Sequence, residues 1–193
     1  MAFPCFLLVS LAMAPLEDTS SLMHDMDIMK EDFFAFGESI NIDLEDFLTH
    51  FHPIVTFYGK EEKRKVNEQA HHQLLDIYMK VQLYKDKLTQ TCCSIQFYEE
   101  MDVACYHHSP QWVLSLLQSY RGYLDETHTQ LLSLHLDVCA LFTSTHQLIQ
   151  TTWPDDLSVT PMLRSFMVML DDRIEDMFYT QMDKCQEWIA HFT

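Results

Sequence analysis

Glycine is scarce in this sequence, which has three Gly and six Pro among its 193 residues. Turn-rich all-β folds and nucleotide-binding folds with glycine loops need many more of these residues. Thirteen Phe, eight Tyr and twelve Met supply enough apolar surface to exclude a largely disordered chain. The composition therefore predicts an all-α protein, and its length suits one domain with a sizeable core better than two.

Positive charge is also scarce, because 12 Lys and Arg stand against 29 Asp and Glu, giving a net charge of −17. Residues 60–98 hold seven of these twelve bases. A field of this sign repels phosphate backbones and anionic lipid, so we predict no nucleic-acid binding, and membrane-surface binding is disfavoured. The acidic surface promotes solubility, and the alternative reading is that it meets a protein partner with a basic surface.

Catalytic signatures are missing too. The chain has no G-x-x-x-x-G-K, G-x-G-x-x-G, H-E-x-x-H or G-x-S-x-G sequence. A di-iron bundle needs Glu-x-x-His motifs on two facing helices, and the chain has a single one, from Glu68 to His71. Adjacent carboxylates such as Asp125 and Glu126 point in different directions on a helix, whereas acid–base catalysis needs carboxyls that face one cleft. We therefore predict a protein that is not an enzyme and holds no cofactor.

The nearest approach to a metal site is a group of thiols and imidazoles around the first turn between long helices. Its members are Cys92, Cys93, Cys105, His107 and His108. These are the ligand types that Zn²⁺ takes, but adjacent cysteines cannot easily turn to one ion, and C-x-x-C spacing is missing. We predict no metal here; the alternative is a disulfide from Cys92 or Cys93 to Cys105 in a secreted protein.

Eleven histidines are an unusual number, and His128 and His135 lie seven residues apart on one face of a predicted helix. Histidine titrates near neutral pH, so a pH-responsive surface is one interpretation. Scattered histidines in contact with solvent are the interpretation that we favour.

Residues 1–20 form an apolar segment followed by a linker, and residues 21–193 form a single helical domain. Residues 1–14 end in the A-x-A pattern of a signal peptide, but no basic residue precedes the apolar run and Pro15 follows the cleavage point. The run is too short to span a bilayer. We expect it to pack on the domain of a cytoplasmic protein; the alternative is cleavage and secretion.

One or two short N-terminal helices follow, and we expect them to pack on the longer ones. The first contains residues 26–36 and ends at Gly37, a residue common after helices. The second begins at Asp43 and is broken or kinked at Pro53, which lacks the backbone N–H that a helix needs.

The strongest pattern is a ladder of residues with alternating spacings of three and four in a helix over about 109–151. Its members are Val113, Leu117, Tyr120, Leu124, Thr127, Leu131, Leu134, Val138, Leu141, Thr145 and Leu148. Such spacing predicts a helix with one buried, coiled-coil-like seam. Gly122 interrupts this helix, and a bend or a close neighbouring helix would explain it.

Two further helices are predicted, over about 60–101 and 160–192. The first has its own ladder of Ala70, Leu74, Ile77, Val81, Tyr84, Leu88, Thr91, Ile95 and Tyr98. The second has Leu163, Met167, Leu170, Ile174, Phe178, Met182, Cys185, Ile189 and Phe192. Short connections predict that the three long helices form an antiparallel bundle. Apolar residues also flank the central seam at Leu116, Tyr123, Leu132, Cys139, Phe142 and Ile149, which predicts contact with more than one neighbour.

These features favour a non-enzymatic helical-bundle protein that binds other proteins as an adaptor, scaffold or assembly subunit, with self-association left open. Candidate partner-binding residues are the aromatic side chains Phe33, Phe34, Phe36, Trp112, Trp153 and Trp188. One alternative is a secreted four-helix ligand of the cytokine kind. Another is a membrane-binding dimer of three long helices, but its basic face would depend on the few bases of residues 60–98.

The central seam yields a first prediction. Leu131→Asp should unfold the monomer, because it buries an unpaired charge at a cost of several kcal/mol. Circular dichroism and urea denaturation measure the loss. A variant that dissociates an oligomer but keeps full helicity would contradict an intrachain seam.

Overall fold

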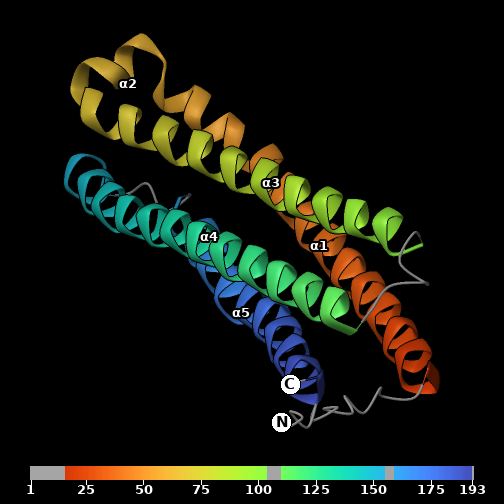
Figure 1. Ribbon diagram of the computed structural model, residues 1–193. Coiled ribbons are helices and arrows are strands. Elements are labelled where there is room, and N and C mark those ends of the chain that lie inside the picture. Colours follow the sequence, from red (N-terminus) through yellow and green to blue (C-terminus); the bar gives the residue numbers. More distant parts are fainter. Residues whose placement is uncertain (1–15, 104–109, 155–158, 193) are drawn as a thin grey trace, which may run out of the picture.

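The computed structural model of the chain describes residues 16–103, 110–154 and 159–192. Within these ranges the chain forms helices α1 (Leu16–Tyr58), α2 (Glu61–Val66), α3 (Glu68–Val103), α4 (Pro110–Thr152) and α5 (Val159–Phe192). The all-α bundle is therefore confirmed, and Figure 1 shows α1, α3, α4 and α5 as long rods with α2 at one end. Of the N-terminal segment and linker expected over residues 1–20, residues 1–15 lie outside the described residues, and residues 16–20 belong to α1 and do not form a linker.

The four long helices run up, down, up and down around the core. Residue numbers rise along one helix as they fall along its neighbour in each packed pair, which makes the pairs antiparallel. Two contacts establish this for each pair of helices. Between α1 and α3 they are Asn41 with Thr89 and Glu45 with Lys85, and between α3 and α4 they are Gln73 with Thr145 and Lys80 with Asp137. Between α4 and α5 they are His128 with Phe178 and Phe142 with Phe166, and between α1 and α5 they are Met29 with Gln181 and Asp43 with Arg173. Each helix thus packs beside two neighbours, in the ring order α1, α3, α4, α5.

The N-terminal part of the bundle differs from the expected pair of short helices, because α1 is one continuous helix of 43 residues. Pro53 lies inside it. Proline in a helix interior costs about 3 kcal/mol. The apolar face continues across this point, with Phe51 before it and Val55 and Tyr58 after it all buried. Burial of each such side chain contributes about 1.5–3 kcal/mol, so the buried face outweighs the proline.

Gly37 does not end a helix, as expected from the sequence, but lies in the middle of α1 where it packs on α3. A Cβ at this position would lie 2.5 Å from the Sγ atom of Cys92. Glycine therefore allows a close approach between the two helices. Gly122 on α4 has a different environment, since a Cβ there would meet nothing within 4 Å. The close neighbouring helix that we considered for Gly122 is therefore missing among the described residues.

The helix predicted from residue 60 is divided at Asn67, the C-cap of α2. The Asn67 side chain accepts a hydrogen bond from the backbone N–H of Ala70 at 2.9 Å, which caps the first turn of α3. Its amide donates to the hydroxyl of Thr152 at 2.7 Å. Asn67 thus fastens the start of α3 to the end of α4, while none of the residues of α2 is buried.

The α3 ladder is confirmed from Ala70 to Thr91, all seven positions of which are buried. The described positions of the α5 ladder from Ile174 to Cys185 are buried as well. Every position of the α4 ladder is buried as far as Leu124, and beyond it Leu131, Val138 and Thr145 remain buried. The other late members, Thr127, Leu134, Leu141 and Leu148, are half-buried, and the neighbouring positions His128, His135, Phe142 and Ile149 are buried instead. A straight helix has 3.6 residues per turn, so its buried stripe drifts by about 20° per heptad from an ideal 3.5-residue repeat. Phe142 and Ile149, expected as flanks, thereby join the core.

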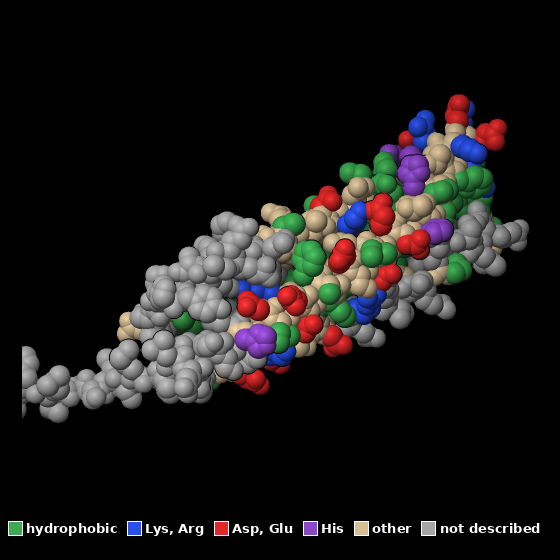
Figure 2. Space-filling model, turned by 90° about the vertical axis from the view of Figure 1, so that its right-hand side faces the viewer, with side chains coloured by type: hydrophobic (Ala, Val, Ile, Leu, Met, Phe, Trp, Pro, Cys, Tyr) green, Lys and Arg blue, Asp and Glu red, His purple; other side chains and the backbone are tan. Residues whose placement is uncertain are grey.

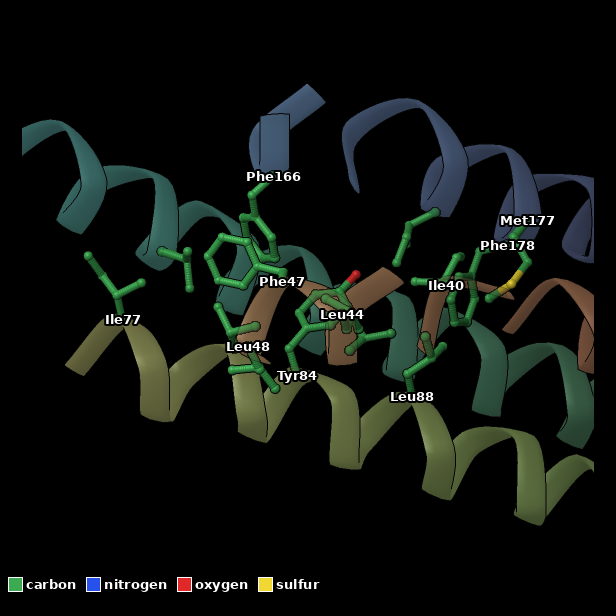
Figure 3. Packing of buried hydrophobic residues seen from close by; sticks show 14 of the residues in the cluster. Ile40, Leu44, Phe47, Leu48, Ile77, Tyr84, Leu88, Phe166, Met177 and Phe178 are labelled. Carbon is green, nitrogen blue, oxygen red and sulfur yellow. The ribbon is translucent and has the colours of Figure 1, made fainter. Parts of the chain in front are cut away.

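An aromatic layer joins three helices in the middle of this core. Phe47 of α1 lies 4.5 Å, between ring centroids, from Phe166 of α5 and 6.4 Å from Phe142 of α4. Phe51, one turn further along α1, stacks on Phe47 at 5.1 Å. Figure 3 shows Phe47 and Phe166 meeting above Leu48, while Ile77 and Tyr84 approach from α3.

The two helix-interior glycines give a matched pair of variants. Gly122→Ala should raise the free energy of unfolding by about 1 kcal/mol, because alanine favours the helix and has open space. Gly37→Ala should lower it by about 1–3 kcal/mol, because its Cβ overlaps the Cys92 thiol. Urea denaturation measures both. The Gly37→Ala/Cys92→Ala double variant should recover most of the loss. Equal stabilisation by the two alanines would contradict the close approach.

Candidate interaction surface

The cysteine and histidine group is only partly within the described residues. Cys92 is buried beside Gly37, and its neighbour Cys93 is exposed, so the two thiols face different surroundings. Cys105, His107 and His108 lie outside the described residues. Across residues 16–103, 110–154 and 159–192, no three His, Cys, Asp or Glu side chains are arranged to hold a metal ion.

Three titratable groups of the described residues with clearly raised pKa values lie in the core. Burial raises the pKa of the Cys92 thiol to about 11 and that of the Cys185 thiol to about 12. Burial also raises the pKa of Tyr84. In each case the cause is loss of hydration of the charged form. A reactive cysteine needs the opposite shift, which forms thiolate near neutral pH, so these groups stabilise the core in their neutral forms.

Two histidines occupy core positions that the sequence did not lead us to expect. His128 is 6% exposed, and its ring lies 5.3 Å from the Phe178 ring and 5.1 Å from the Tyr179 ring. The Nε2 atom of His128 is buried without a hydrogen-bond partner among the described residues. His135 is also 6% exposed, and its Nε2 lies 3.4 Å from the Cys139 thiol. The favoured interpretation of solvated histidines is wrong for this pair.

The three candidate phenylalanines have different surroundings. Phe33 is buried, and its ring makes an edge contact with Phe178 at 5.4 Å. Phe36 is partly buried under the guanidinium of Arg173, 5.4 Å from its ring centre. Phe34 is 42% exposed. Of the three, Phe34 therefore keeps the most surface for a partner, while Phe33 contributes to the core.

The three candidate tryptophans pack on the bundle. Trp153 lies 5.0 Å from the Tyr58 ring, with the ammonium of Lys63 5.0 Å above its own ring. This contact fastens the end of α4 to the end of α1 and to α2. Trp112 and Trp188 are partly buried against a small cluster of Val113 and Leu117. None of the three ranks among the exposed large hydrophobic side chains of the described residues.

Exposed apolar side chains instead form a stripe along the outer side of α3. Leu75 is 41% exposed, Met79 58% and Leu83 45%. A spacing of four residues places them about one turn apart on one side of the helix. The α3 ladder buries the opposite side. The sequence signal for this stripe was a second four-residue repeat beside the ladder, and our sequence interpretation missed it.

The exposed charged groups beside the stripe are carboxylates. The lysines of the same part of α3 are directed to neighbouring helices. Lys80 pairs with Asp137 of α4 at 3.1 Å, Lys85 pairs with Glu45 of α1, and Lys87 donates to Gln130 of α4. The outer-side carboxylates Asp76 and Asp86 are exposed beside the apolar residues. We call Leu75, Asp76, Met79, Leu83 and Asp86 the outer face of α3.

The wider surface has the same character on the side seen in Figure 2. Acidic and hydrophobic side chains are interspersed along its middle with some lysine and arginine, and further lysine and arginine gather with acidic groups at the upper end, where Figure 1 places α2. One open hollow of about 540 Å³ lies at the start of α3. It is lined by Glu68, Gln69, His72, Gln73 and Asp76. This lining comes from one helix, so it has no facing groups to hold a substrate between two walls.

Comparisons with known protein families, with curated proteins and with solved structures found no match for this chain. Among the described helices, none has an apolar stretch long enough to cross a membrane.

The buried thiols give a chemical prediction. At pH 8 the alkylating reagent iodoacetamide should modify Cys93 in the folded protein, while Cys185 should be protected because it is buried and its pKa is raised to about 12. Peptide mass spectrometry over a time course measures both. The same reaction in urea is the control, in which Cys185 should react as well. Equal rates of alkylation of Cys93 and Cys185 in the folded protein would contradict the burial of Cys185 in the packed face of α5.

Proposed function

We propose that this protein is a cytoplasmic, non-enzymatic helical bundle that acts by binding other proteins, as an adaptor, scaffold or assembly subunit. The observation that carries the proposal is the stripe of Leu75, Met79 and Leu83 on the outer side of α3. Apolar side chains that repeat along one exposed helix face are typical of sites where a second protein packs.

The electrostatics of the chain favour partners with basic surfaces. The net charge of −17 supplies a long-range attraction for cationic proteins and a repulsion for nucleic acid. The basic residues of α3 that could offset this charge, Lys80, Lys85 and Lys87, are directed to neighbouring helices of the bundle.

The interior chemistry supports binding over catalysis. Among the described residues, Tyr84, Cys92 and Cys185 have clearly raised pKa values, and all three are buried in the core. A catalytic group needs access to a substrate as well as a shifted pKa. The open hollow on α3 is lined by other residues.

A secreted ligand of the cytokine kind is the second candidate, and the presence of four long helices favours it. Bundles of that kind, however, run up, up, down, down with two long crossover connections. Here each helix is antiparallel to the next, and the connections are short. We therefore retain intracellular protein binding as the proposal.

Affinity capture tests this function. The tagged full-length chain should retain a specific set of proteins under native conditions, and Leu131→Asp, which disrupts the core, should lose them. Quantitative mass spectrometry compares the two captures. Cross-linking would then identify the bundle face in contact. A folded, monodisperse chain that captures nothing beyond the unfolded variant would contradict the proposal.

A further inference from the structure

We propose that the outer face of α3 binds a single amphipathic helix of a partner protein, one that carries lysine or arginine beside an apolar stripe. This inference rests on the proposed protein-binding function and adds the place and the chemistry of the contact. It concerns Leu75, Asp76, Met79, Leu83 and Asp86, which belong to one continuous helix.

The spacing of the apolar residues suits a helix as the ligand. Leu83 lies eight residues after Leu75, with Met79 midway, which is about 12 Å along the helix at a rise of 1.5 Å per residue. A partner helix with apolar residues at every third or fourth position offers a stripe of the same length. Because α3 is held between α1 and α4 along this stretch, the face is ordered before the partner arrives.

The charges beside the stripe favour a partner that carries positive charge. Lys80 and Lys87 turn to α4, and Lys85 turns to α1. Asp76 and Asp86 remain exposed at the two ends of the apolar stripe. A helix with a cation near each end of its apolar stripe would place opposite charges together, which raises both the association rate and the specificity.

A second copy of this chain is a poorer occupant of the same face. Two copies would bring together two surfaces whose flanking charges, Asp76 and Asp86, are both acidic, within molecules that each carry −17. Three partly exposed apolar side chains also provide much less area than the roughly 800 Å² per partner of a stable protein interface. A basic helix gains an electrostatic attraction to Asp76 and Asp86 that a second acidic copy lacks.

The probe for this site is a synthetic helical peptide with leucines at positions i, i+4 and i+8 and lysines flanking them. Fluorescence anisotropy of the labelled peptide measures its affinity for the full-length chain. Two control peptides separate the contributions. One control peptide replaces the lysines by glutamates and tests the contribution of positive charge. The other replaces the leucines by serines and keeps the charge, so its affinity measures the general attraction of a basic peptide to an acidic protein.

The protein variants form a matched pair, because Met79 is 58% exposed on α3 and Leu136 is 59% exposed on α4. Met79→Glu and Leu136→Glu each add one negative charge to an exposed helix position. Met79→Glu should weaken peptide binding about tenfold, the effect of about 1.4 kcal/mol, and Leu136→Glu should change it less than about twofold. Asp86→Lys should also weaken binding. Circular dichroism verifies that all three variants stay folded.

Other outcomes would overturn the inference. Equal affinities for Met79→Glu and Leu136→Glu, or for the leucine and serine peptides, would show that only net charge attracts the probe. Failure of the lysine peptide to bind would also reject a basic helix as the ligand. Loss of self-association in Met79→Glu, measured by light scattering, would identify a second copy as the occupant. Partners captured by the wild type and kept by Met79→Glu would leave the proposed function intact and remove this face from it.

Discussion

The burial of one face of α1 from Met29 to Tyr58, against α3 and α5, is the constraint on which the other features of the bundle depend. Its apolar face supplies Phe47 and Phe51 to the central aromatic layer and Phe33 to the edge contact with Phe178. That face continues past Pro53, and Gly37 lets α1 approach α3 at Cys92. Without α1, the other three long helices would expose the apolar surface that it covers. Burial on this scale explains why a helix that contains both glycine and proline stays continuous.

Polar contacts align the helices around this apolar core. Asn67 caps the first turn of α3 and donates a hydrogen bond to Thr152, so one side chain holds the start of α3 to the last residue of α4. Gln181 of α5 donates to the backbone carbonyl of Met29 on α1 at 2.7 Å in a buried position. Such buried hydrogen bonds require one register, because a shift of either helix would leave polar atoms unpaired.

The same alignment determines what the surface presents. The lysines of α3 lie between helices, where Lys80 pairs with a carboxylate of α4 and Lys85 pairs with a carboxylate of α1. The outer side of α3 is left with apolar residues and exposed carboxylates. The outer side of α3 therefore carries acidic charge without neighbouring lysines, because the lysines of α3 pair with groups on the neighbouring helices. The interaction face that we infer is a consequence of how the bundle is assembled.

The sequence alone determined the helical class and the buried seam of α3, because periodic apolar residues and scarce glycine depend on local geometry. Only the tertiary structure decided that α1 is unbroken, since partners distant in sequence outweigh Pro53. It also decided that His128 and His135 enter the core, because the drift of a straight helix accumulates over many turns. The stripe of Leu75, Met79 and Leu83 was present in the sequence. Its exposure depended on which sides of α3 were covered by α1 and α4, and apolar spacing by itself does not say that.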